Sequence, residues 1–229
     1  MNDMVKAGRG KRATQELFKL GTRELILEKA EELFAAKGIE GASIRDITAA
    51  AGVNLAAINY HFETKEGLVK ALFISRMEPM EQRRRLLLDA VEEKARQSCK
   101  PLTIEAVMEA FILPMLEQGY HKRGNQAFFK MLGRSFGEPN KQIHELVRKH
   151  ADETRRRFDA ALISIFPHLQ PEELFWKINF TMGAVHHSLL TFAHVASLRQ
   201  KPAYHPTLED MMRWLIPYVS AGFQASPSL

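Results

Sequence analysis

Residues 41–68 read GASIRDITAAAGVNLAAINYHFETKEGL, and this stretch holds two short helical patterns on either side of one glycine. Ser43 can cap the first helix, and Asp46 completes a capping box three residues later. Asn54 is a good cap for the second helix. Between the two helices, Gly52 can adopt the positive φ that a tight turn requires. The stretch therefore predicts a helix-turn-helix. The two helices are expected over residues 43–51 and 54–60.

The residues around this stretch also follow a helical period. Before it, apolar residues recur at i, i+4, i+7 and i+8 from residue 22 onward, and Gly38 is expected to end that helix. These apolar residues are Ile26, Ala30, Leu33 and Phe34. After it, Thr64 is expected to cap a long helix that continues past Pro79 to about Arg96.

The chain beyond Pro101 is a series of amphipathic helical patterns separated by short breaks. Breaks are expected at Gly119, 137–139, 167–171 and 200–206. The helices are expected over residues 102–118, 125–136, 140–166, 172–198 and 207–223. Together with the four upstream helices, these make about nine, and the fold class is predicted to be all-α.

Length and composition fit a small helical domain beside a larger one. The chain has 229 residues, 45% of them hydrophobic, with 13 Gly and 10 Pro. We expect a flexible basic arm over 1–20, a small domain with the helix-turn-helix over 21–70, and a larger helical domain over 71–229. Residues 1–20 carry five Lys or Arg against two acids, whereas residues 21–70 carry six against eight. Phosphate contacts must therefore come from a few well-placed groups.

The outward face of the second helix of the pair suits a DNA groove. Ile58 is expected in the core, which leaves small residues, Asn59 and Tyr60 on the outside. Asn59 can pair bidentately with adenine, and Leu55, Ala56 and Ala57 suit thymine methyl groups. Arg45, on the preceding helix, is expected to read guanine or to bind phosphate. The alternative is that Asn59 and Arg45 are solvated surface residues.

The quoted stretch and the helix before it resemble the signature of TetR-family regulators over residues 22–73. The matching residues are Phe34, Gly38, Ser43, Ile44, Ile47, Ala51, Gly52, Val53, Tyr60, His61, Phe62, Lys65 and Leu68. Thr48 and Glu63 depart from the signature, and neither is expected to disturb the fold. The resemblance implies a dimeric repressor of a palindromic DNA operator, with a helix-turn-helix DNA-binding domain over 21–70 and a helical ligand-binding and dimerisation domain over 71–229. It also implies phosphate contacts from Ser43, Tyr60, His61 and Lys65.

Within that family, the sequence VNLAAINYHF at 53–62 and the segment at 171–184 are similar to the fatty-acid-responsive PsrA-type repressors. This similarity implies a small hydrophobic effector, a long-chain fatty acid or acyl-CoA, that releases the protein from DNA. Met and Phe concentrated in two consecutive helices suit a deformable apolar pocket, although each is also an ordinary core residue. The expected pocket residues are Met108, Phe111, Met115, Phe128, Phe129, Met131, Leu132 and Phe136, with Arg134 or His186 meeting an acidic head group.

The last two long helices are expected to form the homodimer interface, as the resemblance implies. Each carries an apolar stripe, and the alternative is that both stripes pack on their own core. The stripe residues are Leu174, Ile178, Met182, Val185 and Leu189, followed by Leu208, Met211, Leu215 and Val219.

Enzymatic function is not expected. The stretch His144-Glu145 begins like a zincin motif but has Arg148 in place of the second ligand, and no histidine follows an acid by three residues. P-loop, dinucleotide-binding and nucleophile-elbow motifs are absent, so neither a metal nor a cofactor is expected. A helical carrier of apolar ligands, or an interaction protein without operator binding, stays open as the other class.

The cellular setting follows from the same sequence. The single cysteine, Cys99, fits a reducing compartment and is expected to have no structural role. Neither a signal peptide nor a membrane-spanning segment is expected. We therefore expect a cytoplasmic protein that associates with the nucleoid through DNA and does not bind membranes.

Overall fold

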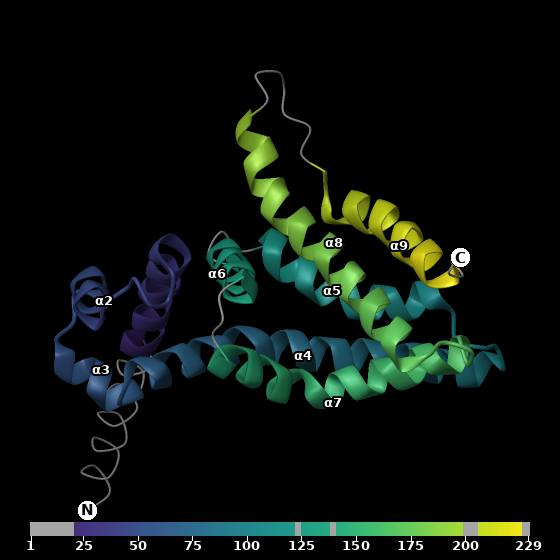
Figure 1. The fold of residues 1–229 in the computed structure, drawn as a ribbon, viewed down its shortest axis with the longest axis horizontal. Coiled ribbons are helices and arrows are strands. Elements are labelled where there is room, and N and C mark those ends of the chain that lie inside the picture. Colours follow the sequence, from purple (N-terminus) through teal and green to yellow (C-terminus); the bar gives the residue numbers. More distant parts are fainter. Residues whose placement is uncertain (1–20, 122–124, 138–140, 199–205, 226–229) are drawn as a thin grey trace, which may run out of the picture. The chain divides into compact units, whose positions relative to one another are not determined.

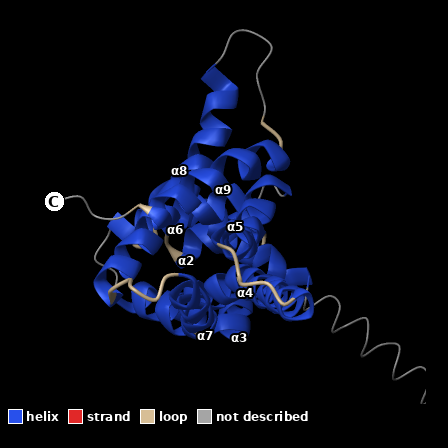
Figure 2. Cartoon of the chain, turned by 90° about the vertical axis from the view of Figure 1, so that its right-hand side faces the viewer, coloured by secondary structure: helices blue, strands red, loops and turns tan. Residues whose placement is uncertain are grey.

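The computed structural model describes residues 21–121, 125–137, 141–198 and 206–225. Within these ranges the chain is helical, with nine helices and no strand (Figures 1 and 2). The predicted basic arm over 1–20 lies outside the described residues. The chain divides into two compact units, Met1–Phe73 and Ile74–Leu229.

The first unit is built from a helix over residues 21–37, α2 (Ile44–Ala51), α3 (Leu55–Phe62) and the beginning of α4 (Lys65–Ser98). All four residues of the apolar stripe expected on the first helix lie in that helix, and the stripe faces the interior of the unit. The interior of the unit consists of large apolar side chains from all four helices. Its most deeply buried members include Ile26, Leu27, Phe34, Ile47, Ile58, Leu68, Leu72 and Phe73.

The second unit contains the rest of α4 followed by five more helices. These are α5 (Ile104–His121), α6 (Asn125–Gly137), α7 (Lys141–Ile165), α8 (Pro171–Leu198) and α9 (Leu208–Gln224). In this unit α5 packs against α6, α7, α8 and α9. Pro79 and Pro114 lie inside α4 and α5 without ending them.

The break predicted at Gly119 is wrong, because α5 continues through this residue to His121. A Cβ atom added to Gly119 would lie 2.4 Å from Leu189 Cδ2 of α8. The glycine therefore allows α5 and α8 to approach closely rather than ending the helix. Of the other breaks, residues 166–170 separate α7 from α8.

Cys99, expected to have no structural role, ends α4 in a left-handed conformation with φ 51°. Its N–H donates to Arg96 O at 3.2 Å, and Lys100 N–H donates to Ala95 O at 3.0 Å. These two bonds form a Schellman motif, which normally places glycine at this position. The side chain of Cys99 is exposed.

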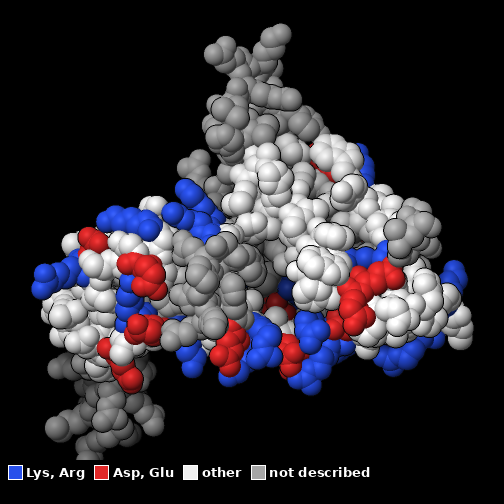
Figure 3. All heavy atoms as spheres, in the orientation of Figure 1, with Lys and Arg blue, Asp and Glu red and all other residues white. Residues whose placement is uncertain are grey.

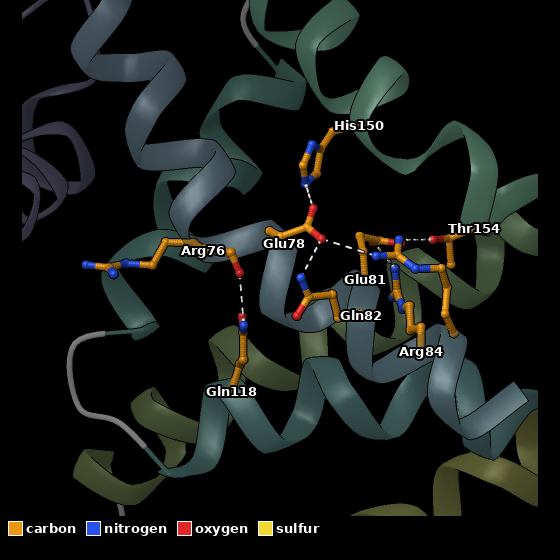
Figure 4. A network of polar contacts seen from close by, with 9 residues as sticks. Arg76, Glu78, Glu81, Gln82, Arg84, Gln118, His150 and Thr154 are labelled. Carbon is orange, nitrogen blue, oxygen red and sulfur yellow. Dashed lines mark hydrogen bonds and ion pairs between the residues drawn. The ribbon is translucent and has the colours of Figure 1, made fainter. Parts of the chain in front are cut away.

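Polar side chains join α4 to α7 (Figure 4). Arg85 donates to Glu78 Oε1 and to Thr154 Oγ1, both at 3.1 Å, and His150 Nε2 lies 2.9 Å from Glu78 Oε2. Farther along α4, Arg157 of α7 pairs with both Asp89 and Glu92. These two helices are thus linked by long charged side chains.

Candidate functional site

Ser43 and Asp46 form the predicted capping box at the beginning of α2. The Asp46 N–H donates to Ser43 Oγ at 3.1 Å, and the Ser43 N–H donates to Asp46 Oδ2 at 3.1 Å. Hydrogen bonds from the Ser43 N–H and hydroxyl hold the pKa of the Asp46 carboxyl below its ordinary value, helped by Lys37 at 3.5 Å. The box fixes where α2 begins, and Arg45 follows as an exposed residue.

The turn between α2 and α3 depends on Gly52, whose φ is 62°. Its N–H donates to Ala49 O at 3.3 Å, and Val53 N–H donates to Thr48 O at 3.0 Å. Glycine adopts this backbone conformation without the steric cost that a side chain adds. The turn brings the chain directly to Asn54, which caps α3 by accepting a hydrogen bond from Ala57 N–H at 3.0 Å.

Helix α3 has one buried side and one exposed side. Ile58 and Phe62 are 1% and 5% exposed and fix the helix to the core of the first unit. Leu55 and Tyr60 are 54% and 65% exposed. The predicted DNA-reading residues Leu55, Ala56 and Asn59 are exposed, and Ala57 and His61 are half-buried. The helix continues two residues beyond the predicted end at Tyr60.

Asn59 and Arg45 carry side chains that form no hydrogen bond or ion pair with another described residue. Tyr60 and His61 contact each other edge to face, with ring centroids 5.0 Å apart. Helix α3 therefore presents an amide on an exposed, largely uncharged surface.

The corner between α3 and α4 is tight. Glu63 has φ 64° and ψ −54°, and Thr64 N–H donates to Phe62 O at 2.7 Å, which makes a classic γ-turn. This positive φ explains why a glycine or small residue suits the position of Glu63. Thr64 Oγ1 accepts from Gly67 N–H at 3.0 Å and caps α4 as predicted.

Near this corner lie one predicted residue, Lys65, and one residue that was not predicted, Gly67. Lys65, predicted to bind phosphate, is half-buried, and its Nζ lies 3.5 Å from Glu40 O. Gly67 was not predicted, although a Cβ atom there would lie 2.0 Å from Phe62 O. The close approach depends on how α3 and α4 meet, and the helical period of the sequence carries no signal for it.

The predicted pocket residues in α5 and α6 are mostly packed core side chains. Met108, Met115, Phe128, Phe129, Met131 and Leu132 are buried. Met108 and Phe111 line a hollow of about 20 Å³ together with Phe158, Leu162, Ile178 and Phe223. This hollow has room for about one water molecule. The side chain of Phe136 lies outside the described residues.

The two residues predicted to meet an acidic head group have different surroundings. His186 Nε2 lies 2.8 Å from Phe129 O, so the ring holds α8 to α6. Arg134 is exposed. The structure does not bring these two side chains together around one cavity.

The stripes predicted for a dimer interface face largely into the chain itself. Leu174, Val185 and Leu189 of α8 and Leu215 and Val219 of α9 are buried, and the remaining four are half-buried. The large hydrophobic side chains that α8 and α9 expose are other residues, and most of them are aromatic. Among the described residues they are Phe175, Trp176, Phe180, Leu190, Trp214 and Tyr218.

Comparison with known proteins places the chain in a family. Residues 26–72 match the model for bacterial regulatory proteins of the tetR family, and residues 109–222 match the model for a tetracyclin repressor-like C-terminal domain. TtgW of Pseudomonas putida, an uncharacterised HTH-type transcriptional regulator, is 30% identical over 105 residues, which are 46% of this chain and 68% of TtgW. The chain belongs to the TetR family of transcriptional regulators.

Other TetR-type relatives match shorter parts. SrpR of Pseudomonas putida is 30% identical over 46% of this chain and 43% of its own length, and YttP of Bacillus subtilis (strain 168) is 44% identical over 24% and 26%. This chain thus spans less than half the length of these two relatives. All three relatives are named as HTH-type transcriptional regulators rather than as enzymes.

Two solved structures share the TetR fold along most of the chain. The fatty acid degradation regulator FadR from Bacillus halodurans has a TM-score of 0.57 and 12% identity, covering 90% of this chain and 97% of its own. A TetR-family regulator from Bordetella parapertussis 12822 has a TM-score of 0.54 and 17% identity, covering 90% and 98%. At these identities the likeness shows the fold alone.

Membrane spans and metal sites were considered for the residues that the structure describes. None of the described helices is both long and apolar enough to span a membrane. Across the same residues, no group of three or more His, Cys, Asp or Glu side chains is placed to hold a metal ion.

Proposed function

We propose that this chain is a homodimeric repressor whose first unit binds a palindromic operator and whose second unit carries the effector and dimer sites. The observation that carries the proposal is the exposed side of α3. There the Asn59 amide has no hydrogen-bond partner among the described residues, while Ile58 and Phe62 fix the opposite side in the core. An exposed amide on a short, well-anchored recognition helix suits base reading in the major groove.

Base reading would come from few side chains. Asn59 pairs bidentately with adenine, and Leu55, Ala56 and Ala57 contact thymine methyl groups, so we expect A·T pairs beneath α3. Arg45, exposed on α2, reads a guanine or binds a phosphate. One such module reads few base pairs, which is why two copies are required.

Phosphate contacts would position this helix on the duplex. Ser43, Tyr60, His61 and Lys65 lie at or next to helix ends and supply polar groups. The N-terminus of α4, just after Thr64, adds the positive end of a helix dipole beside Lys65. The Glu63 carboxylate opposes this attraction, so phosphate binding here depends on the geometry of the corner.

The two copies would meet through the exposed aromatic face of α8 and α9. Trp176 stacks on Phe180 with ring centroids 5.8 Å apart, and these two side chains are 56% and 68% exposed. Figure 3 shows mostly uncharged side chains over α8 and α9, in contrast to the alternating charges along α4 and α7. A large uncharged aromatic surface is typical of a protein interface, and a second copy supplies the same surface.

The effector would be a small hydrophobic molecule, and the PsrA-type resemblance favours a long-chain fatty acid or acyl-CoA. The hollow beside Met108 and Phe111 is the proposed interior site, and it must expand to admit such a ligand because it now holds only about 20 Å³. Met and Phe side chains can repack to do so. Effector binding would favour a conformation with lower operator affinity.

The test is a fluorescence-anisotropy titration of the full chain with its own upstream intergenic DNA at about 150 mM salt, where non-specific binding is weak. We expect Asn59→Ala to reduce specific affinity about tenfold or more, because a bidentate base contact contributes about 1–3 kcal/mol. Adding oleoyl-CoA is expected to release the DNA.

Each part of the proposal can fail separately. Glu32→Ala, which changes an exposed residue on the helix over 21–37, is the matched control and should leave affinity unchanged. DNA binding that ignores oleoyl-CoA would remove the proposed effector while keeping the regulator. No specific binding, even after selection from random sequences, would favour a carrier or interaction protein instead.

A further inference from the structure

A large groove lies between the C-terminal part of α4 and the first half of α5. Its volume is about 430 Å³, which is within the range of about 300–1,000 Å³ that small-molecule sites occupy. The walls are aliphatic, with Leu87 and Val91 from α4 and Ala106, Ala110 and Leu113 from α5. The groove shares none of its lining residues with the interior hollow beside Met108 and Phe111.

Local hydrogen bonds fix the C-terminal end of α4 and the N-terminal end of α5, the two helices that form the groove. The Schellman motif at Cys99 ends α4, and Pro101 follows within the turn. Thr103 then caps α5, because its Oγ1 accepts from Ala106 N–H at 3.3 Å and its carbonyl accepts from Val107 N–H at 3.2 Å. The corner is therefore fixed by its own bonds, and short alanine side chains on both walls leave the space unfilled.

The charges on the groove are mainly positive. Lys94 and Lys100 line it, and Glu109 is the one acidic residue among its lining side chains. Neither lysine forms an ion pair with a described residue. An aliphatic groove that is lined by two lysines, neither of them paired with a described acidic residue, complements a molecule that has an apolar part and an anionic group.

We propose that the α4–α5 groove is a preformed binding site for an aliphatic molecule that carries one anionic group. The tail lies against Leu87, Val91 and Leu113, and the anion lies near Lys94 and Lys100. This site does not depend on operator binding and is additional to the interior effector site. A medium-chain carboxylate such as dodecanoate has the required chemistry.

The first experiment is isothermal titration calorimetry of the full chain with dodecanoate below its micelle concentration. We expect one saturable dodecanoate site in the groove, in addition to any binding at the proposed interior site. Ala106→Phe places a ring in the groove and should abolish this binding. Ala160→Phe, the same change at an exposed position of α7, is the matched control and should bind like the unchanged chain.

The charge is tested with a second pair of measurements. Replacing both lysines, Lys94→Gln with Lys100→Gln, should weaken dodecanoate binding about fivefold or more, since two partly exposed ion pairs are lost. The same double variant should bind dodecan-1-ol as the unchanged chain does. Equal weakening of both ligands would overturn the assignment of the anion to these lysines.

The location is tested through Cys99, the single cysteine, which is exposed and adjacent to Lys100. An environment-sensitive fluorophore attached there should change its emission on titration with dodecanoate, with the affinity found by calorimetry. An unresponsive fluorophore together with unchanged binding to Ala106→Phe would place dodecanoate elsewhere and overturn the proposal. Ala106→Phe should bind the operator normally. Failure of the groove proposal can therefore be distinguished from failure of the proposed repressor function.

Discussion

Among the residues that the structure describes, two that are not glycine hold backbone conformations that glycine adopts more easily. They are Glu63, with φ 64°, and Cys99, with φ 51°. Such conformations cost a non-glycine residue about 1 kcal/mol or more, while glycine loses more entropy on folding. We expect Glu63→Gly and Cys99→Gly each to increase the free energy of unfolding by about 0.5–1 kcal/mol, measured by urea denaturation.

The opposite change provides the control. Gly52 has φ 62° and no atom within 4 Å of an added Cβ, so Gly52→Ala tests backbone strain without a packing clash. It should decrease the free energy of unfolding by about 1 kcal/mol. A destabilised Cys99→Gly variant would contradict the account of strain at the end of α4.

The buried ion pair of α4 gives a second prediction at this scale. Arg84 and Glu81 are 5% and 1% exposed, with Nη1 and Oε1 2.8 Å apart, and the guanidinium lies 4.2 Å from the centroid of the Phe111 ring. Arg84→Ala leaves the Glu81 carboxylate buried without its cation and should reduce stability by about 3–5 kcal/mol. Thermal and urea unfolding of the variant measure this loss.

Two comparisons separate charge from packing here. Arg96→Ala removes an ion pair with Glu93 in which both side chains are largely exposed, and it should cost about 0.5 kcal/mol or less. Replacing both buried partners with Met should recover most of the stability lost in Arg84→Ala. If the double variant is as unstable as the single one, the loss comes from packing on Phe111 rather than from an unpaired charge.

Among single residues, those whose role is local could be predicted from the sequence. Ser43, Gly52, Asn54 and Thr64 act within a few residues of their own position, and the structure places all four as expected. Arg84 depends on Phe111, which is 27 residues away in α5. Helical periodicity cannot show that an arginine pairs inside a core.

Among the elements, the positions of helices followed from periodicity, but the contacts between them did not. Each predicted helix is present, and its ends agree with the structure to within three residues. The break predicted at Gly119 rests on the low helix propensity of glycine. Its close approach to Leu189 comes from the packing of α5 against α8, which no local pattern records.

A second glycine, Gly133, lies where two helices approach closely, in this case α6 and α8. This contact leads to a prediction about helix packing. A Cβ atom on Gly133 would lie 2.3 Å from Cε1 of His186, whose Nε2 lies 2.8 Å from Phe129 O. Gly133→Ala must displace the ring and lose that hydrogen bond, so it should cost about 1–3 kcal/mol in urea unfolding.

A double-mutant cycle tests whether the clash is with this ring. His186→Ala removes the ring that the new methyl group would meet, so adding Gly133→Ala to it should cost little or stabilise α6 slightly. Additive losses in the double variant would show that His186 is not the residue that excludes a side chain at position 133.

At the scale of the whole molecule, periodicity could not decide which side of α8 would face a partner. The helix is apolar on more than one side. The stripe of Leu174, Val185 and Leu189 is buried within the chain, whereas Trp176 and Phe180 lie on the exposed face. A single sequence gives the same apolar signal for a core face and an interface face. The choice between them required the packing of α5 and α6 on α8.

The exposed face of α8 leads to the prediction for the assembly. We expect the full chain to sediment as a dimer at micromolar concentration, and Phe180→Asp to sediment as a monomer, since it places a charge at the centre of an apolar contact. Monomer folding should change little because Phe180 is 68% exposed within one chain. Leu86→Asp is the matched control: Leu86 is 63% exposed and belongs to α4 rather than to α8 or α9, and its variant should stay dimeric. Since two linked recognition helices bind a palindrome far more tightly than one, Phe180→Asp should also weaken operator binding about a hundredfold or more. A dimer that survives Phe180→Asp but dissociates with Leu86→Asp would move the interface from α8 and α9 to α4.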